Sequence, residues 1–151
     1  MPDTEESTRQ ESVARATERL RLAESRLARR RQTDCGPSEN ARAAMRFVYE
    51  RSDADEDVTP TAIAEHLGVS TAAVTGILDR LRAGGLVTFR AHPSDGRSKL
   101  VVPVDRSVDL DDIDPLTAKI RRLSAGLSEE AMVEIAGFLD AVADEVDQEC
   151  V

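Results

Sequence analysis

The strongest constraint on the fold is the run TPTAIAEHLGVSTAAVTGILDRLRAGG, in which two helix signals are separated by a very short turn. Thr59 and Ser70 are residue types that favour helix N-caps, and the proline after Thr59 suits a first helical turn. Gly68 is the usual left-handed stop and leaves one residue before the second cap. The sequence therefore predicts a helix over 59–67 and a second helix over 71–83. Their predicted inner faces are Ile63, Ala64 and Leu67, and then Val74, Ile77, Leu78 and Leu81.

The segment after the second helix predicts a β-hairpin. Two β-rich runs, LVTFRA and KLVVPV, flank the polar stretch HPSDGRS, and the Asp95-Gly96 pair within it is a strong hairpin signal. Residues 86–104 are therefore expected to form a hairpin with a protruding polar tip. Two helices and a hairpin in this order make a winged helix-turn-helix, whose second helix enters the DNA major groove while the hairpin reaches the backbone or the minor groove.

Helical periodicity flanks this middle segment on both sides. Residues 5–32 carry a narrow apolar seam at alternating spacings of three and four, which is typical of a helix that meets another helix. Ser38 is a good N-cap for an amphipathic helix. The C-terminal third returns to helix after an acidic stretch over 105–114 that is expected to be a solvated linker. The apolar positions of these helices are Val13, Ala16, Leu20, Ala23 and Leu27, then Ala41, Ala44, Met45 and Val48, then Ile113, Leu116, Ile120 and Leu123, and finally Met132, Ile135, Leu139, Val142 and Val146.

The predicted fold class is mainly α with a small β-hairpin wing, as a winged helix-turn-helix flanked by N- and C-terminal dimerisation helices. Residues 1–151 are expected to form a single domain. The DNA-binding lobe is predicted over 38–104, and the dimerisation helices over 5–32 and 112–150.

Composition and charge restrict the class of protein. Hydrophobic residues make up 40% of the chain and charged residues 32%, so the chain is expected to fold. No apolar stretch approaches the roughly 18 residues of a membrane span, and the acidic, polar start does not resemble a signal peptide, so we expect a cytoplasmic protein. The net charge of −9 matches that of residues 105–151 alone, whereas residues 58–104 carry five basic and three acidic side chains. A mildly basic middle segment is compatible with salt-sensitive DNA binding.

Enzymatic and metal chemistry are not expected. The sequence has no Ser-His-Asp arrangement with an elbow motif, no glycine-rich phosphate loop and no paired carboxylates in an apolar context. His66 and His92 are interpreted as surface histidines, so neither a metal nor a cofactor is predicted. Cys35 follows three arginines that would lower the pKa of its thiol and make it a redox sensor; the alternative interpretation is an ordinary loop cysteine.

The stretch from TPTAIAEHLGVS to the end of the hairpin resembles the DNA-binding core of the MarR family of bacterial transcriptional regulators. The matching pieces are AEHLGVS, the VT and DRL spacing of the second helix, GGLV, and the wing pattern P-x-D-x-R. The resemblance implies an obligate homodimer with interlocked terminal helices and one winged helix per subunit on a pseudo-palindromic operator. It also implies release of DNA by a small phenolic ligand or by thiol oxidation. The family often has Asp before the wing proline, where this chain has His92.

The candidate DNA-binding residues lie on the recognition helix at 71–83, including its cap, and on the wing at 91–99 with the strand residue before it. Small residues and hydroxyls let a helix approach a groove closely, and a protruding guanidinium suits a narrow groove. The candidates are Ser70, Thr71, Ala72, Thr75 and Arg80 on the helix, and Arg90, Arg97 and Lys99 on the hairpin.

Arg90, Arg97 and the wing residue Asp95 each leave alternatives open. Arg90 is expected either to contact a phosphate or to form an internal ion pair. Asp95 is expected either to orient Arg97 or to favour the turn. Arg97 is the strongest candidate contact, and its alternative is a solvated hairpin charge.

The predicted function is a dimeric DNA-binding transcriptional regulator, a repressor, with double-stranded operator DNA, a second copy of the chain and a small-molecule effector as partners, and no membrane partner. The alternative is a winged-helix protein-interaction module without DNA binding. The acidic balance of the chain favours that alternative, and the arginine at the wing tip opposes it.

Overall fold

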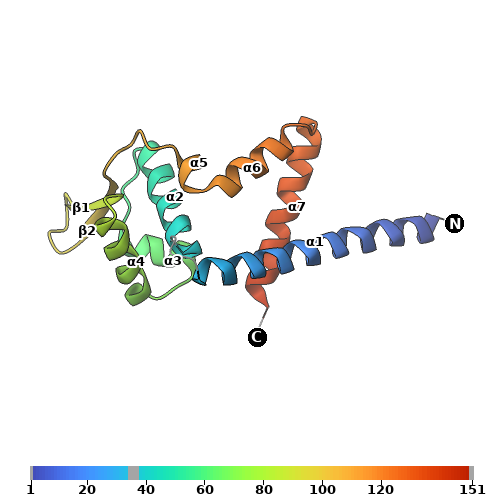
Figure 1. Cartoon of the computed structure of the whole chain (residues 1–151), viewed down its shortest axis with the longest axis horizontal. Helices are drawn as coiled ribbons and strands as arrows, with labels where there is room; N and C mark the ends of the chain where they lie inside the picture. The colour runs from blue at the N-terminus through green and yellow to red at the C-terminus, as the bar shows by residue number, and fades with distance from the viewer. Residues whose placement is uncertain (1, 34–37, 150–151) are drawn as a thin grey trace. The chain divides into compact units, whose positions relative to one another are not determined.

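The computed structural model describes residues 2–33 and 38–149, and the chain divides into two units, Met1–Ser107 and Val108–Val151. Figure 1 labels the helices and strands of both units. The first unit holds α1 (Pro2–Thr33), α2 (Glu39–Asp53), α3 (Pro60–Leu67), α4 (Thr71–Ala83), β1 (Val87–Ala91) and β2 (Lys99–Pro103). The second unit holds α5 (Leu110–Ile113), α6 (Pro115–Ser124) and α7 (Glu129–Gln148).

The predicted helix-turn-helix is confirmed by α3 and α4. The side chain of Thr59 accepts a hydrogen bond from the Ala62 N–H at 3.1 Å, and that of Ser70 accepts one from the Ala73 N–H at 3.2 Å. Gly68 adopts the left-handed conformation, with φ of 65°, and ends α3. These local signals turn the chain within three residues and set the direction of α4.

The core of the first unit lies between α2, α3, α4 and the hairpin. Helix α2 packs against α3, α4 and β2, and α4 also packs against β1. The expected inner faces are buried, apart from Leu67, which is half-buried. The buried apolar side chains from α2 and α4 are Ala41, Ala44, Met45, Val48, Tyr49, Val74, Ile77, Leu78 and Leu81. This packing leaves the opposite face of α4 in solvent.

The predicted hairpin is confirmed, with a longer tip than a two-residue turn. Strands β1 and β2 are antiparallel, in a register that pairs Val87 with Pro103 and Ala91 with Lys99. Residues 92–98 form the loop, which the His92 N–H closes by donating to the Ser98 carbonyl at 3.1 Å. The positive φ that a two-residue Asp-Gly turn requires is not present at Gly96.

Helix α1 is continuous, as predicted for residues 5–32 (Figure 1). Most of its apolar seam is exposed: Val13 and Leu20 are each 46% exposed, whereas Leu27 is half-buried.

The C-terminal unit departs from the predicted periodicity. The spacing from Ile113 to Leu123 predicts one helix, but the chain breaks at Asp114, where φ is −127° and ψ is 77°. Pro115 causes the break, because its ring disfavours helical geometry at the preceding residue. The expected linker over 105–114 also contains a short helix, α5, whose cap Asp109 accepts from the Asp111 N–H at 2.8 Å.

The apolar side chains of helix α7 are not covered by the rest of the C-terminal unit. None of its side chains is buried, and six large apolar ones are exposed: Met132, Val133, Ile135, Phe138, Leu139 and Val146. Within the described ranges, no single helix has the length and hydropathy to cross a membrane. Helices α3 and α4 reach that threshold only as a pair, which bends by 111° at the turn.

Candidate nucleic-acid interface

The outward face of α4 is small and exposed at its N-terminal end. Thr71, Ala72 and Thr75 are all exposed, as the sequence predicts. The Thr75 hydroxyl donates to the Thr71 carbonyl at 3.0 Å, which leaves its oxygen lone pairs facing outward from the helix. The hydroxyl of Ser70 is occupied by the cap, so it fixes the start of α4 and is less available as a contact.

Gly76 further reduces the side-chain bulk on this face of α4. A methyl group built at Gly76 would meet no atom within 4 Å, because the glycine lies on open surface in the middle of the helix. Arg80, one turn later, donates through Nε to the Gly76 carbonyl at 3.2 Å. The bond holds the Arg80 guanidinium along the helix, and the residue remains exposed.

The wing loop is ordered by Asp95. Its Oδ1 accepts from the Arg97 backbone N–H, and its Oδ2 accepts from the Ser98 hydroxyl, both at 3.0 Å. These two bonds hold the pKa of Asp95 below its ordinary value. Of the two roles expected for Asp95, the geometry corresponds to the turn-forming one, because its carboxylate bonds the backbone of Arg97 and leaves the guanidinium unpaired.

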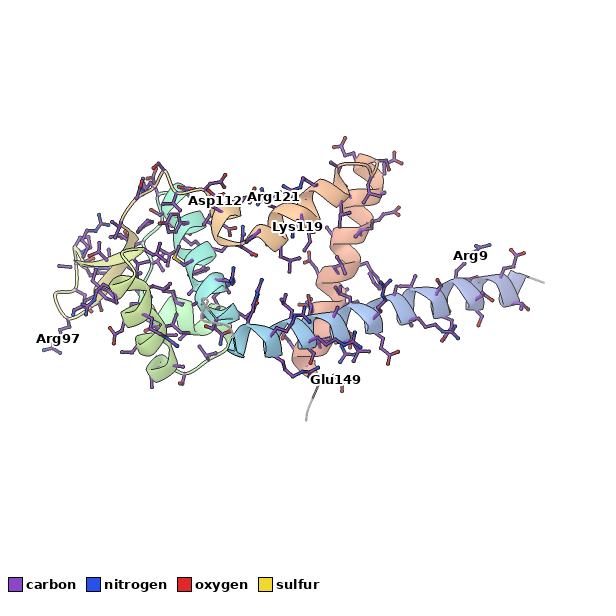
Figure 2. All side chains as sticks on the ribbon, viewed as in Figure 1. Arg9, Arg97, Asp112, Lys119, Arg121 and Glu149 are labelled. Atoms are coloured by element: carbon purple, nitrogen blue, oxygen red, sulfur yellow. The ribbon has the colours of Figure 1, made fainter. Side chains whose placement is uncertain are left out.

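Arg97 lies at the end of this loop. Figure 2 shows its side chain pointing away from the hairpin. It is exposed, and no acidic side chain within residues 2–33 and 38–149 pairs with its guanidinium. A charged group held on an ordered loop and free of internal partners is suited to contact an anion.

His92 is a second ordering residue, which the sequence reasoning treated as an ordinary surface histidine. Its Nδ1 accepts from the backbone N–H groups of Ser94 and Asp95, at 3.1 and 3.2 Å. Its position before the wing proline could have indicated this role, because the MarR family often has an aspartate there, whose oxygen can accept similar bonds. His66 instead stacks on Phe47, with ring centroids 4.3 Å apart.

A basic cluster lies beside the wing, and sequence reasoning identified only part of it. Lys99 Nζ and the Arg82 guanidinium carbon each lie 5.7 Å from the centroid of the Phe89 ring. Both cations are exposed. Arg82 was missed because it lies in the last turn of α4, beyond the face assigned to DNA, and only the packing of α4 on β1 brings it beside Lys99.

Arg90 takes the internal ion pair, one of its two expected roles. Its Nη2 lies 3.2 Å from Oδ1 of Asp57, a residue in the acidic loop between α2 and α3. A pocket of about 420 Å³ adjoins the pair and is also lined by Arg106. Arg106 itself donates to the carbonyl and the hydroxyl of Ser52, at 2.9 and 2.7 Å.

The described part of the chain contains neither a candidate metal site nor the candidate redox cysteine. No group of three or more His, Cys, Asp or Glu side chains there could hold a metal ion. Cys35, the candidate redox residue, lies outside the described residues.

Comparison with known proteins identifies this lobe. Residues 41–98 match the model of the MarR family. An uncharacterized HTH-type transcriptional regulator of Bacillus subtilis (strain 168), YcgE, is 30% identical over 94 residues, and the aligned region spans 61% of this chain and 61% of the relative.

Solved structures share the fold at lower identity. A MarR family transcription regulator is 19% identical, with a TM-score of 0.62 over 97% of this chain and 98% of its own. The MepR–DNA complex of S. aureus gives 16% identity and a TM-score of 0.60, over 87% of this chain and 97% of MepR. A probable transcriptional regulator from Pseudomonas aeruginosa is 24% identical, with a TM-score of 0.58 over 82% of this chain and 92% of its own. The region that matches the MarR-family model, residues 41–98, thus contains α3, α4, β1 and the loop of the wing.

Proposed function

We propose that this chain is a transcriptional regulator that binds double-stranded operator DNA through α4 and the wing. The observation that carries the proposal is the exposed Arg97 on an ordered loop, beside a recognition helix whose outer face is small. The helix would enter the major groove, and Arg97 would enter the adjacent minor groove, where the negative potential is strongest in narrow A-tracts. The MepR structure, which shares the fold and was solved in complex with DNA, supports DNA as the partner.

The same proposal includes a homodimer. The exposed apolar faces of α1 and α7 need a cover, and a second copy supplies matching faces around a two-fold axis. Residues 5–32 and 112–150 would form that interface, while the lobe over 38–104 would bind one half-site of a pseudo-palindromic operator. Repression would follow from occupying the operator, and the family resemblance adds a small-molecule or thiol signal that releases the DNA.

A protein-interaction module is the second candidate. It is favoured by the sequence of α4, which has no Asn, Gln or Lys to read base edges and carries an exposed Asp79 on its outer half. In this alternative the winged fold would recognise a protein and not a groove.

Fluorescence anisotropy with labelled DNA separates the two candidates. The wild-type chain is titrated onto a duplex from upstream of its own gene and onto an unrelated duplex of the same length. We expect tighter binding to the upstream duplex, and weakening of both complexes as salt rises, because phosphate contacts release counterions. Absence of binding to either duplex at low salt would favour the interaction module.

A further inference from the structure

We propose that Asp57 limits the affinity of this protein for DNA by holding Arg90 in an ion pair that a DNA phosphate must displace. The inference rests on the proposed DNA-binding function and concerns the base of the same wing. Arg90 belongs to β1, whereas Asp57 precedes α3, so the two residues meet only through the tertiary fold.

Both partners of the pair are open to solvent. The side chain of Arg90 is 59% exposed and that of Asp57 is 52% exposed. Exposed ion pairs are weak because water screens them and both side chains lose freedom. A phosphate that approaches the wing can therefore compete for the guanidinium, which suits bidentate phosphate contacts.

The backbone on either side of Asp57 is anchored to the rest of the lobe. Val58, next in the chain, is 1% exposed, and its carbonyl accepts from the Val101 N–H at 2.8 Å, which ties the loop to β2. The Glu56 N–H donates to the Arg51 carbonyl at 2.9 Å, and the side chains of these two residues form an ion pair. Asp55 adopts the left-handed region, with φ of 56°, a conformation that the surrounding bonds must hold for a residue other than glycine.

Arg90 is the member that can move. Its long side chain starts from a strand and adjoins the pocket of about 420 Å³, so it has room to turn. When it turns towards a phosphate, Asp57 stays behind as an unpaired negative charge beside the DNA backbone. Asp57 therefore opposes DNA binding by competing with the phosphate for Arg90.

The test compares two neutralised aspartates in the same loop. Asp57→Asn removes the partner of Arg90, and Asp55→Asn removes an equal charge that makes no ion pair with Arg90. Asn tolerates the left-handed conformation at position 55, so the control keeps the loop geometry. Anisotropy with a short duplex of unrelated sequence is a sufficient probe, because phosphate contacts do not depend on sequence.

We expect Asp57→Asn to bind DNA roughly two- to fivefold more tightly per subunit than Asp55→Asn, the range of a weak surface ion pair. The slope of log K against log salt should also steepen by about 0.9 for each phosphate contact that Arg90 gains. In an Arg90→Ala background, the excess of Asp57→Asn over Asp55→Asn should disappear.

Equal affinities of the two Asn variants would overturn this inference and leave Asp57 as one more general negative charge. An excess that persists in the Arg90→Ala background would also overturn it, because the effect would not pass through Arg90. A wild-type chain that binds no duplex at low salt would overturn the proposed function as well, so the two failures are distinguishable.

Discussion

Gly76→Ala should stabilise this protein and weaken its binding to DNA. Gly76 lies inside α4 with a solvent-exposed backbone, and an added methyl group would meet no atom within 4 Å. Replacing glycine by alanine in a helix interior contributes about 1 kcal/mol, partly because the unfolded chain loses freedom. In a chain of 151 residues, that corresponds to a rise of roughly 2–4 °C in melting temperature.

The effect on DNA has the opposite sign. If the outer face of α4 packs into the major groove, the same methyl group overfills a close contact, and overpacking of this kind costs about 1–3 kcal/mol. Gly137→Ala in α7 is the matched control, because Gly137 is also inside a helix with nothing within 4 Å of an added methyl group. It should stabilise the fold similarly and leave DNA affinity unchanged.

Thermal unfolding followed by circular dichroism and anisotropy titrations on the same samples measure both quantities. A Gly76→Ala variant that binds DNA as tightly as the wild type would show that α4 does not approach the groove closely. A fall in its melting temperature would contradict the assignment of Gly76 to an unconstrained helix surface.

Three further predictions concern assembly and the wing. Leu139→Asp should convert a dimer into a monomer in light scattering, because it places a charge in the apolar face of α7; an unchanged dimer would contradict that interface. His92→Ala should lower the hydrogen-exchange protection of the Ser94 and Asp95 amides, whereas His92→Asn should retain it, since an amide oxygen can accept the same bonds. The bonds to Asp95 should persist above the ordinary aspartate pKa of about 3.9 and be lost only as pH falls through its lower folded value. An NMR titration of the Arg97 amide with a midpoint at or above 3.9 would refute that reasoning.

Local signals made the helix-turn-helix predictable. The caps Thr59 and Ser70 and the stop Gly68 act within a few residues of chain, and the apolar spacing of α4 identifies its buried face. The outer face, with Thr71 and Thr75, follows by subtraction. The hairpin itself follows from two β-rich runs, although the Asp-Gly pair lies in a longer loop than the tight turn it favours.

Contacts between distant segments were not predictable in the same way. The pairing of Arg90 with Asp57 depends on the backbone hydrogen bond between Val58 and Val101 of β2, and no local sequence pattern predicts that bond. The role of His92 required the loop conformation to be known. The break before Pro115 is different, because the proline itself is a sequence signal for it. The prediction of one continuous helix followed the apolar periodicity, which continues across the break, and did not take the proline into account.

The operator affinity of Arg97→Ala, measured beside that of Arg9→Ala, tests whether the wing contacts DNA. Both substitutions remove one exposed arginine, and Arg9 lies near the start of α1 (Figure 2). At physiological salt we expect Arg97→Ala to lose about 1–3 kcal/mol of DNA affinity per contact, with melting temperature and dimerisation unchanged, because an exposed loop side chain adds little to folding. Arg9→Ala should bind as the wild type does. Equal affinity of Arg97→Ala and the wild type would contradict the assignment of the wing as a DNA contact and favour the protein-interaction module.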